Sequence, residues 1–166
     1  MPFGAKDNTA FFNHKIATYT HKYLLYHSDY QGQKKVQDLA TRKRIAESYE
    51  GAILVSIHMN AFPDSKYGGL QVYYSENNES SKELAEEIRT LTCTHLQPEN
   101  KRATKPSDGS IYLLDRLLCP AVLVECGFLS NPEDLSALTD PIYQKKLSLV
   151  LCASILEYLE KEASHS

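Results

Sequence analysis

Residues 119–132 have the sequence Cys-Pro-Ala-Val-Leu-Val-Glu-Cys-Gly-Phe-Leu-Ser-Asn-Pro. The three consecutive aliphatic residues at 122–124 predict a fully buried strand, and the next residue is Glu125. A carboxylate at the end of an apolar strand has to be paired, desolvated or catalytic, because burying a bare charge is costly. Gly127 and the Ser-Asn-Pro sequence at 130–132 predict a turn directly afterwards. Because α/β proteins bind ligands at such strand ends, Glu125 is the first candidate for chemistry, with a structural salt bridge as the alternative.

The composition is that of one ordinary globular domain. The chain has 166 residues, of which 42% are hydrophobic and 23% charged, and this length suffices for one sizeable core. Its formal net charge of −3 predicts no attraction to nucleic acid or to anionic lipid. No apolar run approaches the roughly 20 residues that a membrane span requires. The N-terminus has no charged-then-apolar signal pattern, so nothing in this sequence directs secretion.

Helices and strands alternate along the chain after residue 33. Apolar spacing and capping residues predict helices over 33–49, over 79–95 and from Pro141 onward. Apolar runs and alternation predict strands over 52–57, 70–74 and 121–125, a short strand or turn over 111–114, and a polar loop over 97–110. The alternation predicts a single three-layer α/β domain with a twisted, mostly parallel sheet flanked by helices.

A second polar constellation, Ser-Ile-His-Met-Asn at 56–60, is found where the first predicted strand ends, and His58 directly follows that strand. His58 therefore occupies the same kind of position as Glu125. Neutral imidazole is the commonest protein ligand for zinc, and a strand end would fix its direction. The alternative for His58 is a histidine that is hydrogen-bonded in a loop. A metal-bound water with a nearby carboxylate base would make a hydrolase.

Both constellations resemble motifs of one enzyme family. The sequences Ser-Ile-His-Met-Asn-Ala at 56–61 and Val-Leu-Val-Glu-Cys-Gly-Phe-Leu-Ser-Asn-Pro-Glu-Asp at 122–134 are similar to the C-terminal signatures of zinc-dependent N-acetylmuramoyl-L-alanine amidases of the amidase-3 type. Within this family, the chain is most similar to the spore germination-specific amidases. The likeness covers residues 23–162, which we expect to form the catalytic domain. It leaves 1–22 as a divergent or truncated segment and 163–166 as a tail.

The resemblance implies cleavage of the amide between the lactyl group of N-acetylmuramic acid and L-alanine in peptidoglycan, at the cell wall or spore envelope. It implies that His58 is a zinc ligand, and that Glu125 activates the attacking water and passes its proton to the leaving amine. Asn60 is expected to brace the loop after His58 or to face the substrate. Arg102, in a basic loop across from the site, is a candidate for substrate binding, with a solvated loop as the alternative.

The N-terminal part departs from the family pattern. The family begins with a strand that ends in Asp-Pro-Gly-His-Gly-Gly and carries a histidine ligand, and a glutamate at the start of the next helix is a further ligand. This sequence has no such motif and no glutamate before Glu47. We therefore expect an N-terminally truncated or mis-started copy that lacks the first strand or strands of the family. Such a loss would expose a sheet edge and apolar surface.

Zinc should consequently bind weakly or not at all, because a catalytic site needs three protein ligands. His14, His21, His27 and Asp7 could in principle supply ligands, but surface positions are the simpler interpretation of these residues. A second hypothesis is a catalytically dead, amidase-like module that binds cell-wall glycopeptide or a partner. The sequence does not indicate an oligomeric state.

Overall fold

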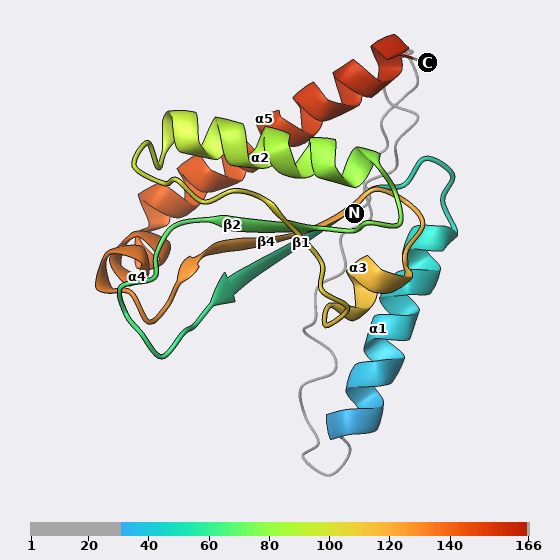
Figure 1. Cartoon of the computed structure of the whole chain (residues 1–166), viewed down its shortest axis with the longest axis horizontal. Helices are drawn as coiled ribbons and strands as arrows, with labels where there is room; N and C mark the ends of the chain where they lie inside the picture. Colours follow the sequence, from blue (N-terminus) through green and yellow to red (C-terminus); the bar gives the residue numbers. More distant parts are fainter. Residues whose placement is uncertain (1–30, 166) are drawn as a thin grey trace, which may run out of the picture.

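The computed structural model of the protein describes residues 31–165. Helices and strands follow one another in the order α1 (Gln31–Glu47), β1 (Leu54–Asn60), β2 (Gln71–Tyr74), α2 (Ser80–His95), β3 (Lys105–Pro106), α3 (Tyr112–Arg116), β4 (Ala121–Phe128), α4 (Pro132–Thr139) and α5 (Pro141–His165) (Figure 1). The described part is therefore α/β, as expected, and α5 continues into the last residues of the chain.

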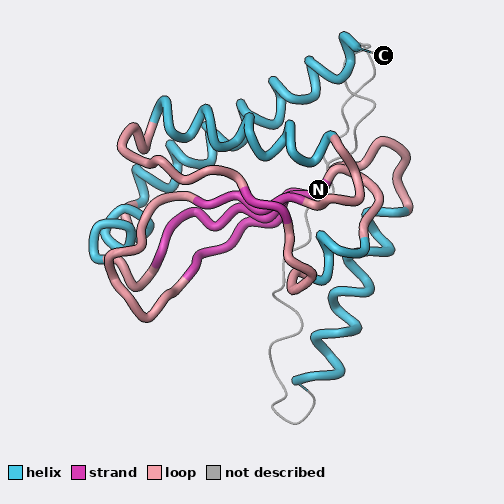
Figure 2. The backbone as a smooth tube through the Cα atoms, viewed as in Figure 1, coloured by secondary structure: helices cyan, strands magenta, loops and turns pink. Residues whose placement is uncertain are grey.

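The sheet is mixed. Within the described residues it has four strands in the order β1-β4-β2-β3. The β1–β4 and β2–β3 pairs are parallel, whereas β2 and β4 run antiparallel. Figure 2 shows the strands as one layer with helices on both sides. The predicted three-layer arrangement is confirmed, and the antiparallel pair is the exception to the predicted parallel pairing.

One face of the sheet is covered by α2, with α5 packed against α2 and α4 (Figure 1). Val122 and Val124 point to this face, because alternate residues of a strand lie on the same side. The core on this side also contains buried residues of three helices, among them Leu84, Ile88, Leu138, Leu147, Leu151 and Tyr158. The apolar stripe predicted for the last helix is thus the surface with which α5 joins the core.

The opposite face carries a smaller core under α1 and α3. Leu123 lies on this face and packs with Leu113, Leu114 and Leu117 of the α3 region. Leu39 of α1 packs against the same cluster. Because Leu123 and Glu125 are two residues apart in β4, Glu125 projects from this face as well. The candidate chemistry therefore lies on the α1/α3 side of the sheet.

Several predicted boundaries were wrong, for physical reasons that involve distant partners. The strand predicted over 52–57 extends to Asn60, and the strand predicted over 121–125 extends to Phe128. Hydrogen bonding between these two parallel strands continues beyond the apolar residues. Gly127 consequently lies within β4 instead of in a turn. The short strand or turn predicted over 111–114 is instead replaced by helix α3, which spans Tyr112–Arg116.

Helix α4 was not predicted, although its capping residues are visible in the sequence. The Asn131 side chain accepts hydrogen bonds from the backbone N–H groups of Glu133 and Asp134, both at 3.0 Å. Pro132 occupies the first turn, where its missing N–H has no consequence. The Ser-Asn-Pro sequence therefore begins a helix and does more than form a turn.

Strand β1 lies at an edge of the sheet formed by the described residues. The side chains of Ile57 and Met59 are 63% and 58% exposed, so apolar surface accompanies this edge of the described sheet. The segment 1–22, for which divergence from the family fold is expected, lies outside the described residues.

Among residues 31–165, no helix combines the length and apolar character needed to cross a membrane.

Candidate active site

Three polar residues lie in one row across three neighbouring strands. His58 of β1 is the cross-strand partner of Glu125 in β4, and Glu125 is also the partner of Gln71 in β2. Neighbouring strands are about 4.8 Å apart, and residues paired in register project to the same face. We call His58, Glu125 and Gln71 the polar row. The structure thus brings together the two residues that the sequence singled out, and adds a third.

Glu125 has an unusual environment for a carboxylate. Its Oε2 atom is buried and has no hydrogen-bond partner among the described residues. Burial raises the pKa of the Glu125 carboxyl above its ordinary value, because removal from water disfavours the charged form. The salt bridge considered as an alternative is not formed within the described part of the chain. A carboxyl with a raised pKa and an unused oxygen is suited to accept and donate a proton.

His58 is exposed on the same face of the sheet. Its Nε2 atom lies 3.3 Å from the hydroxyl of Ser56. Partial burial, and secondarily the positive charge of Arg42, lower the pKa of the His58 imidazole. The shift favours the neutral ring, which has a nitrogen lone pair available for a metal ion or a proton. The prediction that His58 follows the strand was wrong, because this residue is paired within β1.

Arg102 is held next to the polar row by hydrogen bonds and by cation–π contacts. Its Nε donates a hydrogen bond to the carbonyl of Gly68 at 2.8 Å, and its Nη1 donates to Oε1 of Gln71 at 3.4 Å. Its Cζ lies 4.7 Å from the centre of the Phe128 ring and 5.8 Å from that of Tyr67, within the range of cation–π attraction. The basic loop is therefore adjacent to the site and not merely solvated.

Gln71 was missed by the sequence analysis. It is 1% exposed, and its Nε2 donates to the carbonyl of Ala103 at 2.7 Å, while its Oε1 accepts from Arg102. The side-chain amide thereby attaches the loop that carries Arg102 to the strand beside Glu125. The sequence feature that could have indicated Gln71 is its position two residues after Gly68-Gly69, in a short strand where polar and apolar residues alternate.

The loop before α4 is connected to the same end of the sheet by Asp134. Its Oδ2 accepts hydrogen bonds from the backbone N–H groups of Gly69 at 2.8 Å and Phe128 at 2.7 Å. One carboxylate therefore joins the segment that precedes β2 to the end of β4. Gly127 is required beside it, because an added Cβ would lie 2.9 Å from Oδ2 of Asp134.

Asn60 stabilises the loop that follows β1. Its Oδ1 accepts a hydrogen bond from the backbone N–H of Ala61 at 2.8 Å, and its carbonyl accepts from Leu129 N–H at 2.7 Å. In the same loop, the N–H of Phe62 donates to the Ser130 hydroxyl at 3.0 Å. These contacts agree with the expected bracing role of Asn60. A contact with substrate remains a prediction.

The described residues do not form a metal centre by themselves. No group of three or more histidine, cysteine, aspartate or glutamate side chains in residues 31–165 is arranged to hold an ion. His58 is the imidazole of the polar row, and one histidine with one carboxylate falls short of the three protein ligands that catalytic zinc requires. His14, His21, His27 and Asp7, which were considered as substitutes, lie outside the described residues.

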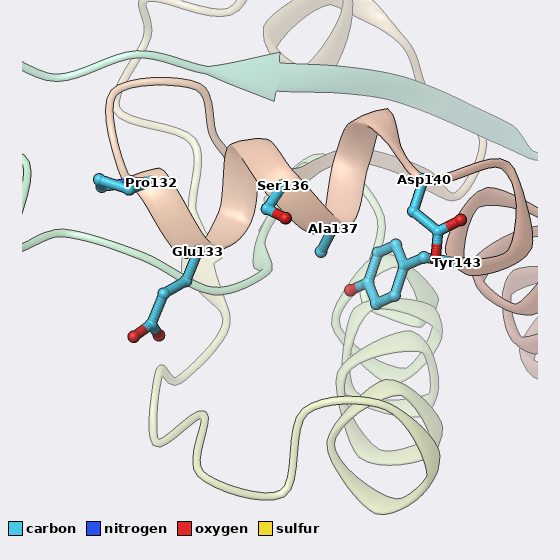
Figure 3. Close-up of a pocket in the computed structure, with 6 residues that line it drawn as sticks. All are labelled: Pro132, Glu133, Ser136, Ala137, Asp140 and Tyr143. Carbon is cyan, nitrogen blue, oxygen red and sulfur yellow. The ribbon is translucent and has the colours of Figure 1, made fainter.

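A shallow hollow lies elsewhere on the surface and contains no residue predicted for the site. It is lined by Pro132, Glu133, Ser136, Ala137, Asp140 and Tyr143. Figure 3 shows these side chains along α4 and the beginning of α5, on the opposite side of α4 from the strand in the same view. The candidate site therefore lies on the face of the sheet that carries the polar row and not in this hollow.

Comparison with known proteins gives consistent matches. Residues 4–157 match the family described as N-acetylmuramoyl-L-alanine amidase. The germination-specific N-acetylmuramoyl-L-alanine amidase of Bacillus subtilis is 31% identical over 134 residues, which cover 78% of this chain and 54% of that protein. This chain therefore spans about half the length of that relative.

Solved structures agree with the sequence matches. The CwlD amidase of Clostridioides difficile, solved in complex with the GerS lipoprotein, has a TM-score of 0.73 and 39% identity, covering 82% of this chain and 70% of that one. The amidase AmiC2 of Nostoc punctiforme has a TM-score of 0.66 and 30% identity, covering 73% and 65%. Members of the matched family are generally zinc-dependent.

Proposed function

The chain belongs to the N-acetylmuramoyl-L-alanine amidase family, and from this premise we propose that it hydrolyses the amide between the lactyl group of N-acetylmuramic acid and L-alanine in peptidoglycan. The observation that carries the proposal is the polar row. In this row, a carboxyl with a raised pKa and an oxygen without a partner among the described residues lies beside an imidazole with a lowered pKa on the neighbouring strand.

Glu125 is the proposed proton carrier. In its ionised form it removes a proton from the water that attacks the lactyl carbonyl carbon, and a C–O bond forms. The carboxyl then delivers this proton to the amide nitrogen as the C–N bond breaks. The products are a lactyl carboxylic acid on the sugar and a peptide with a free L-alanine amine. A raised pKa favours both halves of this cycle near neutral pH, because the group has to gain and lose a proton in each turnover.

Asn60 and Arg102 are the proposed substrate-binding residues. The position of Arg102 supports this role, because only Gln71 lies between Arg102 and Glu125. Asn60 holds the loop after His58 in place through its bond to Ala61. The proposed place of action is the cell wall or spore envelope, because the matched relatives include the germination-specific amidase and the amidase LytC of Bacillus subtilis.

His58 is the proposed zinc ligand among the described residues. Residues 31–165 supply too few further metal-binding side chains to hold the ion. Any zinc bound by this chain therefore needs additional ligands from outside residues 31–165. We therefore propose that the zinc site is incomplete within residues 31–165. This proposal is tested by the zinc content of the purified protein before and after exchange of His58.

The experiment for the function compares wild-type protein with Glu125→Gln on purified muropeptides. Release of peptides with a new L-alanine amino terminus is measured by chromatography and mass spectrometry. We expect release by the wild type and a loss of at least about 100-fold in the variant, the scale of a missing general base. Glu133→Gln is the matched control, because Glu133 is exposed and its side chain is not part of the polar row. Binding of muropeptides without cleavage by the wild type would refute the proposal and support a binding module.

A further inference from the structure

The guanidinium of Arg102 has unused hydrogen-bonding capacity. An arginine has five N–H donors. In Arg102, Nε is bonded to the Gly68 carbonyl and one N–H of Nη1 to Gln71. The other three N–H groups have no hydrogen-bond partner in the described part of the chain, and none of the nitrogens is a buried unpartnered atom. Nη2, which has no hydrogen-bond partner among residues 31–165, is therefore not a buried atom.

The position of Arg102 is nevertheless rigidly defined. Two hydrogen bonds and the rings of Phe128 and Tyr67 hold the group, whereas an arginine in solution has many rotamers. No carboxylate within residues 31–165 forms an ion pair with it. A fixed, unpaired guanidinium is ready to bind the two oxygens of a carboxylate in a bidentate manner with little further loss of entropy.

Only one residue, Gln71, lies between Arg102 and Glu125, the proposed reacting centre. Gln71 is the cross-strand neighbour of Glu125 and the hydrogen-bond partner of Arg102. The phenol of Tyr73 is close enough to both groups to be influenced by them: after burial, the main cause of its raised pKa, Glu125 raises and Arg102 lowers this pKa. Successive peptide residues are about 3.8 Å apart, comparable with the strand spacing of about 4.8 Å.

A stem peptide that extends from Glu125 across β2 would therefore bring its second residue to Arg102. We propose that Arg102 binds the free carboxylate of the second stem residue, D-isoglutamate, so that the chain discriminates against stems in which this carboxylate is amidated. This inference rests on the proposed function, because it takes the scissile amide to lie beside Glu125.

The neighbouring basic residue provides a matched comparison. Lys101 is exposed, and its Nζ donates to the Pro98 carbonyl at 3.1 Å. It carries the same charge one position away, but no described contact connects it to the polar row. If the positive charge of the whole loop attracted the acid, removal of Lys101 would weaken binding as much as removal of Arg102. If Arg102 binds the carboxylate directly, only its removal should weaken binding.

The test measures binding of two synthetic ligands, N-acetylmuramoyl-L-alanyl-D-isoglutamate and its D-isoglutamine amide, by calorimetry. Glu125→Gln protein is used so that neither ligand is consumed. We expect the acid to bind about 10- to 100-fold more tightly than the amide, the range for a charged hydrogen-bonded pair. Adding Arg102→Met should reduce the ratio to about one, Arg102→Lys should give an intermediate ratio, and Lys101→Met should leave it unchanged. Circular dichroism confirms that each variant is folded.

Three outcomes would overturn the inference: equal binding of the two ligands, a ratio that survives Arg102→Met, and no binding of either ligand. Cleavage by the wild-type protein is measured separately, so the two proposals fail in different ways. Selective binding of the acid without cleavage would refute the amidase function alone. Cleavage of acid and amide with equal kcat/KM would refute the carboxylate site alone.

Discussion

Exchange of Asp134 for alanine should weaken the connection between two strands that carry the polar row. Oδ2 of Asp134 accepts two backbone N–H bonds, from Gly69 at 2.8 Å and from Phe128 at 2.7 Å. A hydrogen bond to a charged group contributes about 1.5–3 kcal/mol, and both N–H groups lose their acceptor in the variant. Allowing for partial rescue by water, we expect a loss of about 3–5 kcal/mol in the free energy of unfolding, a large part of the roughly 5–15 kcal/mol typical of a domain.

The assay is equilibrium unfolding in urea, with fluorescence and circular dichroism as probes. Asp134→Asn keeps an oxygen acceptor but removes the charge, so we expect an intermediate loss of about 1–2 kcal/mol. Glu133→Ala is the control: it removes a carboxylate from the same helical turn of α4, and its effect should stay below about 1 kcal/mol. A loss below about 0.5 kcal/mol in Asp134→Ala, or an equal loss in Glu133→Ala, would refute this account of how the strand ends are held.

The other predictions concern the backbone, proton binding and metal. Gly127→Ala should lower the free energy of unfolding by about 1–3 kcal/mol in urea titrations, because the new Cβ would crowd Asp134; Gly109→Ala, with a φ of +87° but open space around it, should lose only about 1–2 kcal/mol. In chelator-treated protein, Glu125→Gln should gain stability relative to the wild type as pH rises. The pKa of Glu125 is raised in the folded state, so its contribution is complete below the ordinary value of 4.5 and is lost as pH rises through the folded pKa; parallel pH–stability curves would contradict this. Zinc measured by plasma mass spectrometry should be well below one ion per chain, and lower still in His58→Ala; one tightly bound zinc that survives this exchange would exclude His58 as a ligand.

The sequence was sufficient to single out His58 and Glu125 as candidates for the proposed chemistry, but not to predict how these residues are paired. His58 and Glu125 stand out because each follows an apolar run, and this is a local property. Their direct juxtaposition depends on the register between β1 and β4, which are separated in sequence by residues 61–120. For the same reason, the antiparallel direction of β2 relative to β4 could not be derived from the alternation at Gln71–Tyr74.

Arg102 and Gln71 illustrate a second limit. A basic residue in a polar loop has the same local sequence whether it is solvated or bound to a strand end. Only the folded chain brings the carbonyl of Gly68 and the amide of Gln71 within reach of this guanidinium. Helix α4, by contrast, could have been predicted from the local sequence, since Asn131 and Pro132 are a normal helix start.

The most direct test of the central claim is the identity of the bond that is broken. Muropeptides are digested with the purified protein in ¹⁸O-labelled water, and the fragments are analysed by tandem mass spectrometry. We predict that the label appears in the lactyl carboxylate of N-acetylmuramic acid and that the released peptide begins with an unlabelled L-alanine carrying a free amine. Label at any other position, or intact muropeptides after prolonged incubation, would contradict the proposal that this chain hydrolyses the lactyl–L-alanine amide.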